Sequence, residues 1–298
     1  MSIVIRIKGG IGNQLFMYAA ARRLALISNQ VLLLDDISGF VNDLKYNRRY
    51  QLDHFNIPCQ KAKSMERLEP FSKARRVLKR TINFFLPFET KNYIKQDNAY
   101  FDSKILNLRV KQQLYLEGYF QSEAYFKDFE FQISKDLKIC PPKDDLNNEL
   151  ALKIKKNFPA VALHFRFFNK TSNNEIDKKL SINASIDYYH AAIKKIEKLF
   201  PNAHYFIFSD KPEEAKKQIA FSDKRMTLVS HNDDDEYAFA DLWLMTQCQH
   251  FIIANSTFSW WGAWLAKYKD KVVVAPSISK KYRHWADPKL LPKEWLQL

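Results

Sequence analysis

The chain opens with a short apolar run, a cluster of glycines and a helical pattern. Residues 3–7 are mostly β-branched and strand-like, and the glycines at 9, 10 and 12 then provide a tight turn. Apolar residues recur at mostly helical spacing over 15–26, and a second apolar run over 31–34 ends at two aspartates. This order predicts a β-α-β unit at the start of the chain.

The second half of the chain repeats the alternation of strands and helices. Predicted strands cover residues 160–165, 205–208, 226–229, 251–254 and 272–275. Predicted helices cover residues 185–199, 236–247 and 260–267. This alternation favours parallel sheets flanked by helices, so the predicted fold class is α/β. Because open parallel sheets bind ligands at the carboxyl ends of their strands, we expect functional residues just after Leu163, Phe208 and Ala254.

The length suits two domains. At roughly 100–200 residues per domain, 298 residues make two domains of ordinary size. The pattern breaks at Pro141 and Pro142, a polar helix follows over 144–156, and Pro159 precedes a new apolar strand. We therefore expect an N-terminal domain of residues 1–152 and a C-terminal domain of residues 153–298.

An amphipathic helix is predicted over 71–88, where Pro87 ends it. Its apolar face comprises Phe71, Ala74, Val77, Leu78, Ile82 and Phe85. Its basic residues, which lie largely on the opposite face, are Lys73, Arg75, Arg76, Lys79 and Arg80. One interpretation places this helix on an anionic membrane surface. The other packs its apolar face into the core and leaves the basic face in water.

Composition adds a well-filled core and a strongly basic charge. Hydrophobic residues make up 46% of the chain and aromatic residues 14%, which excludes a disordered protein. The formal net charge of +14 attracts polyanions, anionic lipids and phosphorylated ligands. Nucleic acid would suit this charge, but the sequence contains no recognition module and no stacking platform, so we expect no nucleic acid as a partner.

The sequence also bears on the location of the protein. No window reaches the ~18 apolar residues of a membrane span, and the chain does not start like a secretory leader. We therefore expect a cytoplasmic protein, to which the membrane interpretation of residues 71–88 would add peripheral contact with the inner face of the plasma membrane. Cys59, Cys140 and Cys248 lack the spacing of a disulfide framework or a zinc site, so we expect reduced thiols.

The glycine turn permits a dinucleotide-binding interpretation. A strand, a glycine turn, a helix and the acids Asp35 and Asp36 resemble an NAD-type unit. However, Leu15 occupies the third glycine position of the GxGxxG fingerprint, and a pyrophosphate turn has no need of Asn13 and Gln14. A turn that only reverses the chain leaves these two amides unexplained, and the NAD-type enzyme stays an alternative.

Two polar segments follow predicted strands. His164 and Arg166 stand at the end of one strand, and arginine suits a diphosphate because its guanidinium donates paired hydrogen bonds at any physiological pH. A structural ion pair would explain the same residues. Residues 254–262 place an amide and three hydroxyls between a strand and a helix, where backbone N–H groups and the helix dipole attract anions. A simple N-cap at Thr257 or Ser259 is the alternative there, although it needs only one such residue.

Metal chemistry is not expected. The acidic run from Asp233 to Glu236 directly precedes a helix, where acids interact favourably with the helix dipole, so helix capping explains it better than coordination. Asp241 is a stronger polar candidate, because it stands inside that helix among apolar neighbours. A carboxylate there could accept the paired N–H groups of a guanine edge.

Four motifs in this order resemble glycosyltransferase family 11, the GDP-fucose-dependent α-1,2-fucosyltransferases. They are the segments 9–16 (GGIGNQLF), 117–123 (EGYFQSE), 208–210 (FSD) and 255–262 (NSTFSWWG). The resemblance covers nearly the whole chain, and the first and last motifs are the most specific.

The resemblance implies two Rossmann-like domains facing a cleft, the GT-B type, with GDP held by the C-terminal domain. It further implies that Arg166 binds the β-phosphate, that His164 and Asp241 lie near the guanosine, and that no metal or other cofactor is needed. Around the diphosphate it places Asn255, Ser256, Thr257, Phe258 and Ser259. Gly10, Gly12, Asn13 and Gln14 would face the cleft from the other domain, so the expected catalytic residues are Arg166 and Asn13.

The implied reaction moves L-fucose from GDP-β-L-fucose, with inversion, to a galactose-terminated glycan such as an O-antigen unit, either free or lipid-linked. One motif departs from the family pattern of His-x-Arg-Arg-Gly-Asp, since this chain continues after Arg166 with Phe167, Phe168 and Asn169. A non-catalytic GDP-sugar-binding protein therefore stays open as a further alternative.

Overall fold

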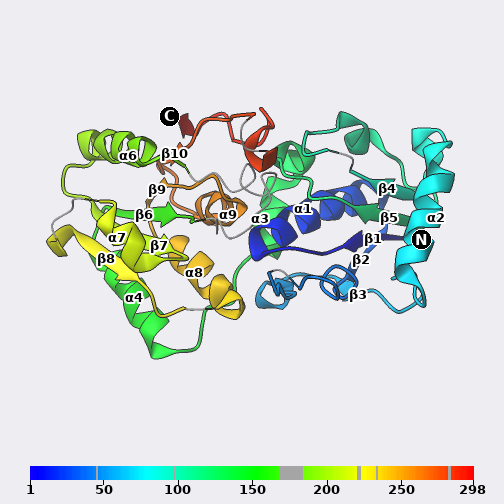
Figure 1. The fold of residues 1–298 in the computed structure, drawn as a ribbon, viewed down its shortest axis with the longest axis horizontal. Coiled ribbons are helices and arrows are strands. Elements are labelled where there is room, and N and C mark those ends of the chain that lie inside the picture. Colours follow the sequence, from blue (N-terminus) through cyan, green and yellow to red (C-terminus); the bar gives the residue numbers. More distant parts are fainter. Residues whose placement is uncertain (45, 97, 168–183, 220–222, 233, 281–282) are drawn as a thin grey trace. The chain divides into compact units, whose positions relative to one another are not determined.

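The structure is a computed structural model that describes residues 1–298 except 45, 97, 168–183, 220–222, 233 and 281–282. The chain forms two compact units, Met1–Lys138 and Ile139–Leu298 (Figure 1). The predicted boundary at 152/153 thus lies 14 residues after the observed one at 138/139. The polar helix before Pro159 therefore belongs to the second unit.

The first unit is built on a five-stranded sheet in the order β3-β2-β1-β5-β4, and all its described strand pairs are parallel. Its strands are β1 (Ser2–Arg6), β2 (Val31–Asp35), β3 (Gln60–Lys61), β4 (Tyr93–Lys95) and β5 (Leu114–Glu117). Its α-helices are α1 (Ile11–Ser28), α2 (Ser72–Phe84) and α3 (Glu130–Asp136). Short 3-10 helices are η1 (Leu52–His54), η2 (Phe88–Thr90), η3 (Ser103–Asn107), η4 (Glu123–Tyr125) and η5 (Lys127–Phe129).

The second unit is built on a six-stranded sheet in the order β11-β10-β9-β6-β7-β8, again with parallel pairs throughout its described strands. Its strands are β6 (Ala160–Phe165), β7 (His204–Ser209), β8 (Met226–Val229), β9 (His250–Ile252), β10 (Val273–Ala275) and β11 (Leu296–Gln297). Its α-helices are α4 (Asp145–Lys156), α6 (Ile186–Leu199), α7 (Pro212–Lys217), α8 (Ala238–Met245) and α9 (Thr257–Leu265). Its 3-10 helices are η6 (Asp223–Arg225), η7 (Asp235–Tyr237) and η8 (Arg283–Trp285). The α/β prediction is therefore confirmed for both units.

Helix α1 begins earlier than the apolar spacing predicts. Only Gly9, with φ of 73°, and the N-cap residue Gly10 form the turn, and the helix starts at Ile11. Gly12, Asn13 and Gln14 therefore lie in the first helical turn, which corrects the prediction of a longer glycine turn. The helix ends at Asn29, whose left-handed conformation caps the last turn in the way that glycine or asparagine commonly does.

The central strands of the second unit are buried on both faces. All six residues of β6 are buried, as are the four central residues of β7. A strand covered by helices on both faces reads as a continuous apolar run, which is why the sequence predicts these strands within a residue or two. No helix in the described part of the chain is long and apolar enough to cross a membrane.

Candidate functional site

His164 is the penultimate residue of β6, a central strand of the second sheet. Its ring is buried, and its Nδ1 atom has no hydrogen-bond partner in the described structure. Burial, with a smaller contribution from the nearby Arg166 guanidinium, lowers the pKa of His164 to about 3. The imidazole is therefore neutral at pH 7. The Tyr189 hydroxyl donates a hydrogen bond to the His164 carbonyl oxygen at 3.1 Å, which fixes the end of the strand.

Arg166 directly follows β6 and is paired with a residue that follows the neighbouring strand β7. Its Nη1 atom lies 3.1 Å from Oδ2 of Asp210. The other carboxylate oxygen of Asp210 accepts the backbone N–H of Phe167 at 2.9 Å. Asp210 ends the 208–210 motif and stands just after Phe208, at one of the strand ends where functional residues are expected. The structural ion pair considered for Arg166 thus exists, and it holds the guanidinium at the carboxyl edge of the sheet.

The hydroxyl-rich segment lies between β9 and α9. Ser256 is the N-cap of α9, and its hydroxyl accepts the Phe258 N–H at 3.3 Å. The N-cap is therefore Ser256 and not Thr257 or Ser259. Asn255 and Ser259 are buried, whereas Thr257 and Phe258 are only partly buried. The first turn of α9 thus presents backbone N–H groups beside the Thr257 side chain, an arrangement that favours anions.

The two segments meet in space. Strands β6 and β9 are parallel neighbours with Leu163 opposite Ile252, so the residues that follow them emerge at the same edge of the sheet. The His164 ring lies 5.4 Å from the Phe258 ring, measured between ring centroids. A residue two positions before Arg166 therefore contacts the first turn of α9. The carboxyl edge of the sheet gathers an imidazole, a guanidinium and a helix N-terminus.

Asp241 stands on α8 and takes part in a hydrogen-bond network. Its Oδ1 atom accepts the Asn232 side-chain amide at 2.7 Å. Asn232 and Asn147 exchange amide hydrogen bonds at 2.9 and 3.0 Å, and the Asn147 amide also donates to Asp144 at 3.0 Å. The buried Asn147 on α4 thus links α4 to α8 and sets the position of the Asp241 carboxylate.

Helix α8 packs directly against α9. A methyl group added at Gly262 of α9 would lie 2.9 Å from Cε of Met245 on α8, so glycine allows this close approach. Asp241 precedes Met245 by one turn, and Phe258 precedes Gly262 by one turn. Asp241 therefore lies one turn from the point at which the two helices meet.

The amides of the first motif differ in their surroundings. Gln14 is fully buried, donates to the carbonyl oxygens of Gly9 and Arg49 at 2.8 and 2.7 Å, and accepts the Gln51 N–H at 2.9 Å. These bonds give Gln14 a structural role that holds the segment around residue 50 against α1. Asn13 is partly exposed and accepts the Gln121 amide at 2.8 Å, so the first motif touches the 117–123 motif. The predicted catalytic role of Asn13 stays a prediction.

A second polar cluster occupies the carboxyl edge of the first sheet. Glu117, at the end of β5, pairs with Arg6 at 2.9 Å and accepts a hydrogen bond from the Tyr93 hydroxyl. The Lys8 amino group lies 3.8 Å from the same carboxylate and 4.8 Å from the centre of the Tyr119 ring. Burial lowers the pKa of Lys8, although Glu117 opposes that shift. The 117–123 motif singled out Glu117 in the sequence, but no sequence pattern distinguished its partners Arg6, Lys8 and Tyr93.

Metal ligands and thiols add nothing to either site. Among the described residues, no group of three or more His, Cys, Asp or Glu side chains could hold a metal ion. Asp233, part of the acidic run, lies outside the described residues. Cys59, Cys140 and Cys248 are free thiols, as predicted.

Together, the fold and the site define an α/β protein of Rossmann type with a candidate anion site at the carboxyl edge of its second sheet. A family model for glycosyl transferase family 11 matches residues 2–298, and the chain belongs to this family. It is 31% identical to the O-antigen biosynthesis glycosyltransferase WbnK of Escherichia coli, across 98% of this chain and 99% of that protein. It is 28% identical to an alpha-1,2-colitosyltransferase of Escherichia coli, across 100% of this chain and 99% of that protein. The protein is therefore a glycosyltransferase.

Solved structures support the fold. Arabidopsis thaliana FUT1, in a mutant form bound to GDP, matches with a TM-score of 0.56 and 13% identity, over 94% of this chain and 71% of that one. The fucosyltransferase NodZ from Bradyrhizobium matches with a TM-score of 0.51 and 14% identity, over 89% of this chain and 92% of that one. At such identities the likeness concerns the fold alone, and it confirms two Rossmann-like units of the GT-B type.

Proposed function

We propose that this glycosyltransferase moves L-fucose from GDP-β-L-fucose to a glycan acceptor, O-2 of a terminal galactose in an O-antigen unit, without a metal or other cofactor. The observation that carries the proposal is the contact between His164 and Phe258, which joins the Arg166 segment to the N-terminus of α9. A guanidinium and a helix N-terminus at one sheet edge suit a diphosphate.

The pyrophosphate is the group that this site recognises. Arg166 donates to the β-phosphate from the position in which Asp210 holds it. The first-turn N–H groups of α9 and the Thr257 hydroxyl donate to the remaining phosphate oxygens. Asn255, Ser256 and Ser259 shape the turn, and the side chain of Phe258 packs on His164. Uncharged His164 adds a neutral hydrogen-bonding atom at Nδ1 without competing with Arg166 for the phosphate.

Asp241 recognises the base. A carboxylate accepts through two oxygens with about four lone-pair directions, so the Asp241 carboxylate that accepts from Asn232 can also accept the N–H groups of the guanine Watson–Crick edge. It lies one turn before Met245, the α8 residue that meets Gly262 of α9, and the first turn of α9 is the one proposed to bind the phosphates. An adenine or uracil edge lacks the paired N–H groups, so this residue makes the site selective for GDP.

The reaction breaks the bond between the anomeric carbon and the β-phosphate oxygen, and the electron pair leaves with GDP. The acceptor hydroxyl attacks the opposite face of the sugar, which gives an α-linked product and releases one proton. Arg166 and the α9 dipole stabilise the negative charge that builds up on GDP, and fixed donors of this kind are typically worth about 10²–10³ in rate. Asn13 is proposed to contact the acceptor hydroxyl, and no side chain is assigned as the base.

Colitose is a second candidate for the transferred sugar, because one relative of this chain is an alpha-1,2-colitosyltransferase. Colitose is fucose without its 3-hydroxyl group, and the two sugars share the same nucleotide. Parallel assays with the GDP derivatives of both sugars, followed by linkage analysis of the product by NMR, decide between them. Higher kcat/KM with the colitosyl donor would replace the fucosyl proposal and leave the GDP site unchanged.

Arg166→Ala tests the site. We expect kcat to fall by about 10²–10³ because the variant loses a charged donor to the leaving group. The assay measures GDP release with and without a galactose-terminated acceptor. Arg225→Ala provides a matched control, since Arg225 pairs with Glu197 at the end of α6, away from the strand ends that form the site.

Three outcomes bear on the alternatives. Near-normal turnover by Arg166→Ala at unchanged thermal stability would refute the phosphate assignment. GDP-fucose binding without acceptor-dependent GDP release in the wild type would identify a non-catalytic sugar-nucleotide-binding protein. Tight binding of NAD in place of GDP would instead support the alternative of an NAD-type dinucleotide-binding enzyme.

A further inference from the structure

Helix α2 turns its polar face towards the rest of the first unit and its apolar face outwards, the reverse of an ordinary surface helix. The residues that face the rest of the first unit recur at helical spacing and are polar: Ser72, Arg76, Lys79 and Asn83. Asn83 is the buried residue of the helix and accepts the backbone N–H groups of Asn92 and Tyr93 at 2.7 and 3.1 Å. Hydrogen bonds of Asn83, at the C-terminal end of this polar stripe, thus fasten the helix to β4.

The opposite face of α2 and the residues just after it are apolar and exposed. Relative exposure is 60% for Val77, 61% for Leu78, 53% for Ile82, 77% for Phe84 and 79% for Phe85. The interpretation in which this face packs into the core is therefore wrong. Exposed apolar residues are normal when scattered singly, but a contiguous face of this kind marks a binding surface.

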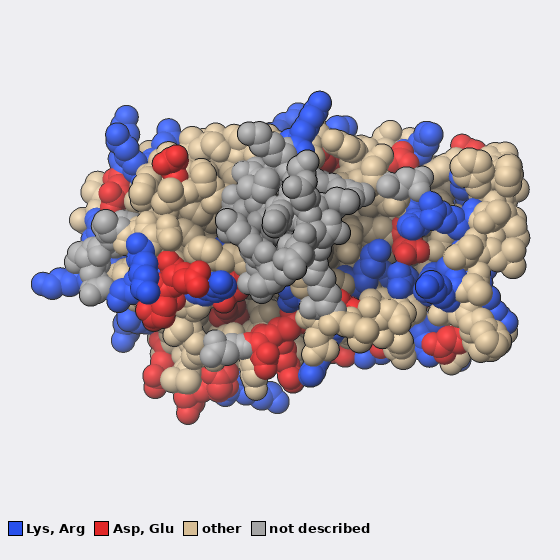
Figure 2. All heavy atoms as spheres, viewed as in Figure 1, with Lys and Arg blue, Asp and Glu red and all other residues tan. Residues whose placement is uncertain are grey.

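Basic residues border this apolar face on both sides. At 100° per residue, Lys73 and Arg80 lie along one border of the face and Arg75 along the other. Figure 2 shows Lys and Arg side chains beside the uncharged surface at the α2 end of the first unit, where α2 is labelled in Figure 1. A wide apolar face with basic borders is the pattern of helices that lie in a membrane interface.

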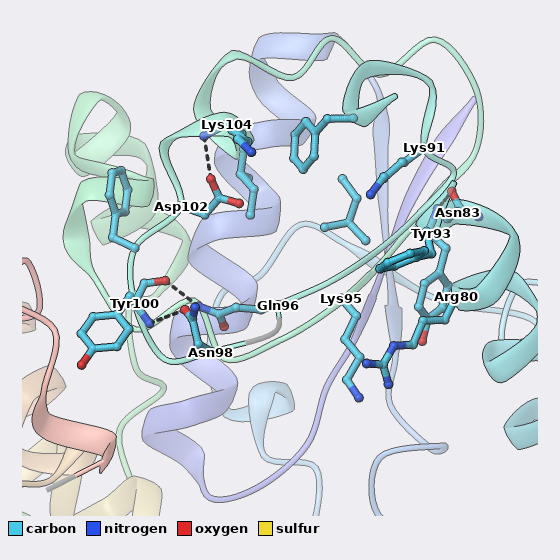
Figure 3. Close-up of a pocket in the computed structure, with 15 residues that line it drawn as sticks. Arg80, Asn83, Lys91, Tyr93, Lys95, Gln96, Asn98, Tyr100, Asp102 and Lys104 are labelled. Atoms are coloured by element: carbon cyan, nitrogen blue, oxygen red, sulfur yellow. Dashed lines mark hydrogen bonds between the residues drawn. The ribbon is translucent and has the colours of Figure 1, made fainter. Parts of the chain in front are cut away.

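A basic groove continues the surface from the C-terminal end of α2. This cavity of about 660 Å³ is lined by Arg80 and Phe84 of α2 together with residues of β4 and η3 (Figure 3). It carries four basic side chains, Arg80, Lys91, Lys95 and Lys104, and one acid among its described residues, Asp102. The groove therefore offers a positive environment for phosphate groups beside the apolar face.

We infer that α2 and this groove form a docking surface for an anionic lipid bilayer, with the apolar face in the acyl boundary and the basic residues on lipid phosphates. A second copy of this chain would carry the same basic borders, so two such faces would repel each other. An anionic bilayer matches both the apolar face and the charge. The inference concerns α2 and the adjoining groove, and it does not depend on which sugar the enzyme transfers.

The test is co-sedimentation of the full-length protein with phosphatidylcholine vesicles, with and without phosphatidylglycerol. We expect binding to the anionic vesicles that weakens as salt increases, because surface charges are screened. Lys73→Ala combined with Arg80→Ala should weaken binding roughly 25-fold, at about 5-fold for each charge. Leu78→Asp combined with Phe85→Asp should abolish binding, and neither pair should change transfer to a water-soluble acceptor.

Leu152→Asp serves as the matched control, because Leu152 is 57% exposed on α4 of the other unit. It should bind vesicles as the wild type does. Absence of binding to anionic vesicles at low salt would overturn the inference. So would a wild-type dimer in sedimentation velocity that Leu78→Asp converts to monomer, since the apolar face would then be covered by a second copy.

Discussion

At the scale of single residues, His164 shows how much of a side chain's surroundings can be predicted from the sequence. The position of His164 at a strand end predicted a place in the site. The structure puts its ring in contact with Phe258, and its role in binding stays a prediction. Its full burial depends on helices and strands distant in sequence, and local pattern does not reveal it. Gln14 is the opposite case. Its place in a specific motif predicted a ligand contact, but in the structure its amide forms three hydrogen bonds with backbone groups.

Burial of His164 predicts a pH-dependent stability. The folded-state pKa of about 3 lies below the ordinary value of 6.5. Between these two pH values the His164 imidazole is protonated in the unfolded chain and stays neutral in the folded chain. The free energy of unfolding therefore falls as the pH drops from about 6.5 towards 3, by up to about 1.4 kcal/mol per pH unit from this residue. His164→Asn should flatten the profile measured by urea unfolding.

The control for this experiment is His190→Asn, because His190 is exposed on α6. The two variants should separate most clearly between pH 4 and 6, in the window that the lowered pKa of His164 defines. Parallel pH profiles for the wild type and His164→Asn would show that the imidazole is not buried in its neutral form.

At the scale of elements, the sequence predicted the elements of the second unit better than those of the first. Continuous apolar runs marked β6 and β7 because those central strands are covered on both faces, whereas the edge strand β8 is only partly buried. Strands β4 and β5 were missed because they have only three and four residues and, in the sequence, polar segments surround them without a neighbouring helical pattern to frame them. Periodicity also defined the apolar face of α2 but could not tell which face meets the protein, since Asn83 and β4 decide that.

The link between α4 and α8 gives a prediction at this scale. Asn147 is buried and bonds to Asp144, Asn232 and His231, so Asn147→Ala leaves several polar groups without their partner. We expect a loss of about 1–3 kcal/mol in the free energy of unfolding, measured in urea. GDP should also bind more weakly, because Asn232 would no longer hold Asp241 in place.

Asn148→Ala is the matched change on the same helix. The Asn148 amide donates only to the Asp144 carbonyl oxygen and is exposed, so the expected effect on unfolding is within about 0.5 kcal/mol. Equal destabilisation by the two variants would mean that the network does not connect the helices. An unchanged affinity for GDP in Asn147→Ala would separate Asp241 from the binding of the base.

At the scale of the whole molecule, the candidate diphosphate site belongs to the second unit and the basic surface around α2 belongs to the first. The net charge of +14 predicted anionic partners without saying which, and the structure assigns basic residues to two different places. In the second unit, Arg166 follows the same strand as His164, whose ring contacts the first turn of α9. In the first unit, α2 and its groove carry basic residues beside an exposed apolar face. The net charge of the whole chain therefore includes contributions from two separate surfaces.

Hydrogen exchange on the full-length protein tests this division. GDP that binds the second unit should slow exchange most at residues 164–167, at 231–241 and at the first turn of α9, because these segments would hold phosphate and base. At about 100 times the dissociation constant, amides that exchange only when the second unit unfolds should slow by up to about 100-fold. Amides of α2 should not change, since no diphosphate is proposed to bind there. Protection centred on residues 10–14 would instead place the nucleotide at the glycine turn of the first unit, and the donor site proposed at Arg166 would have to be abandoned.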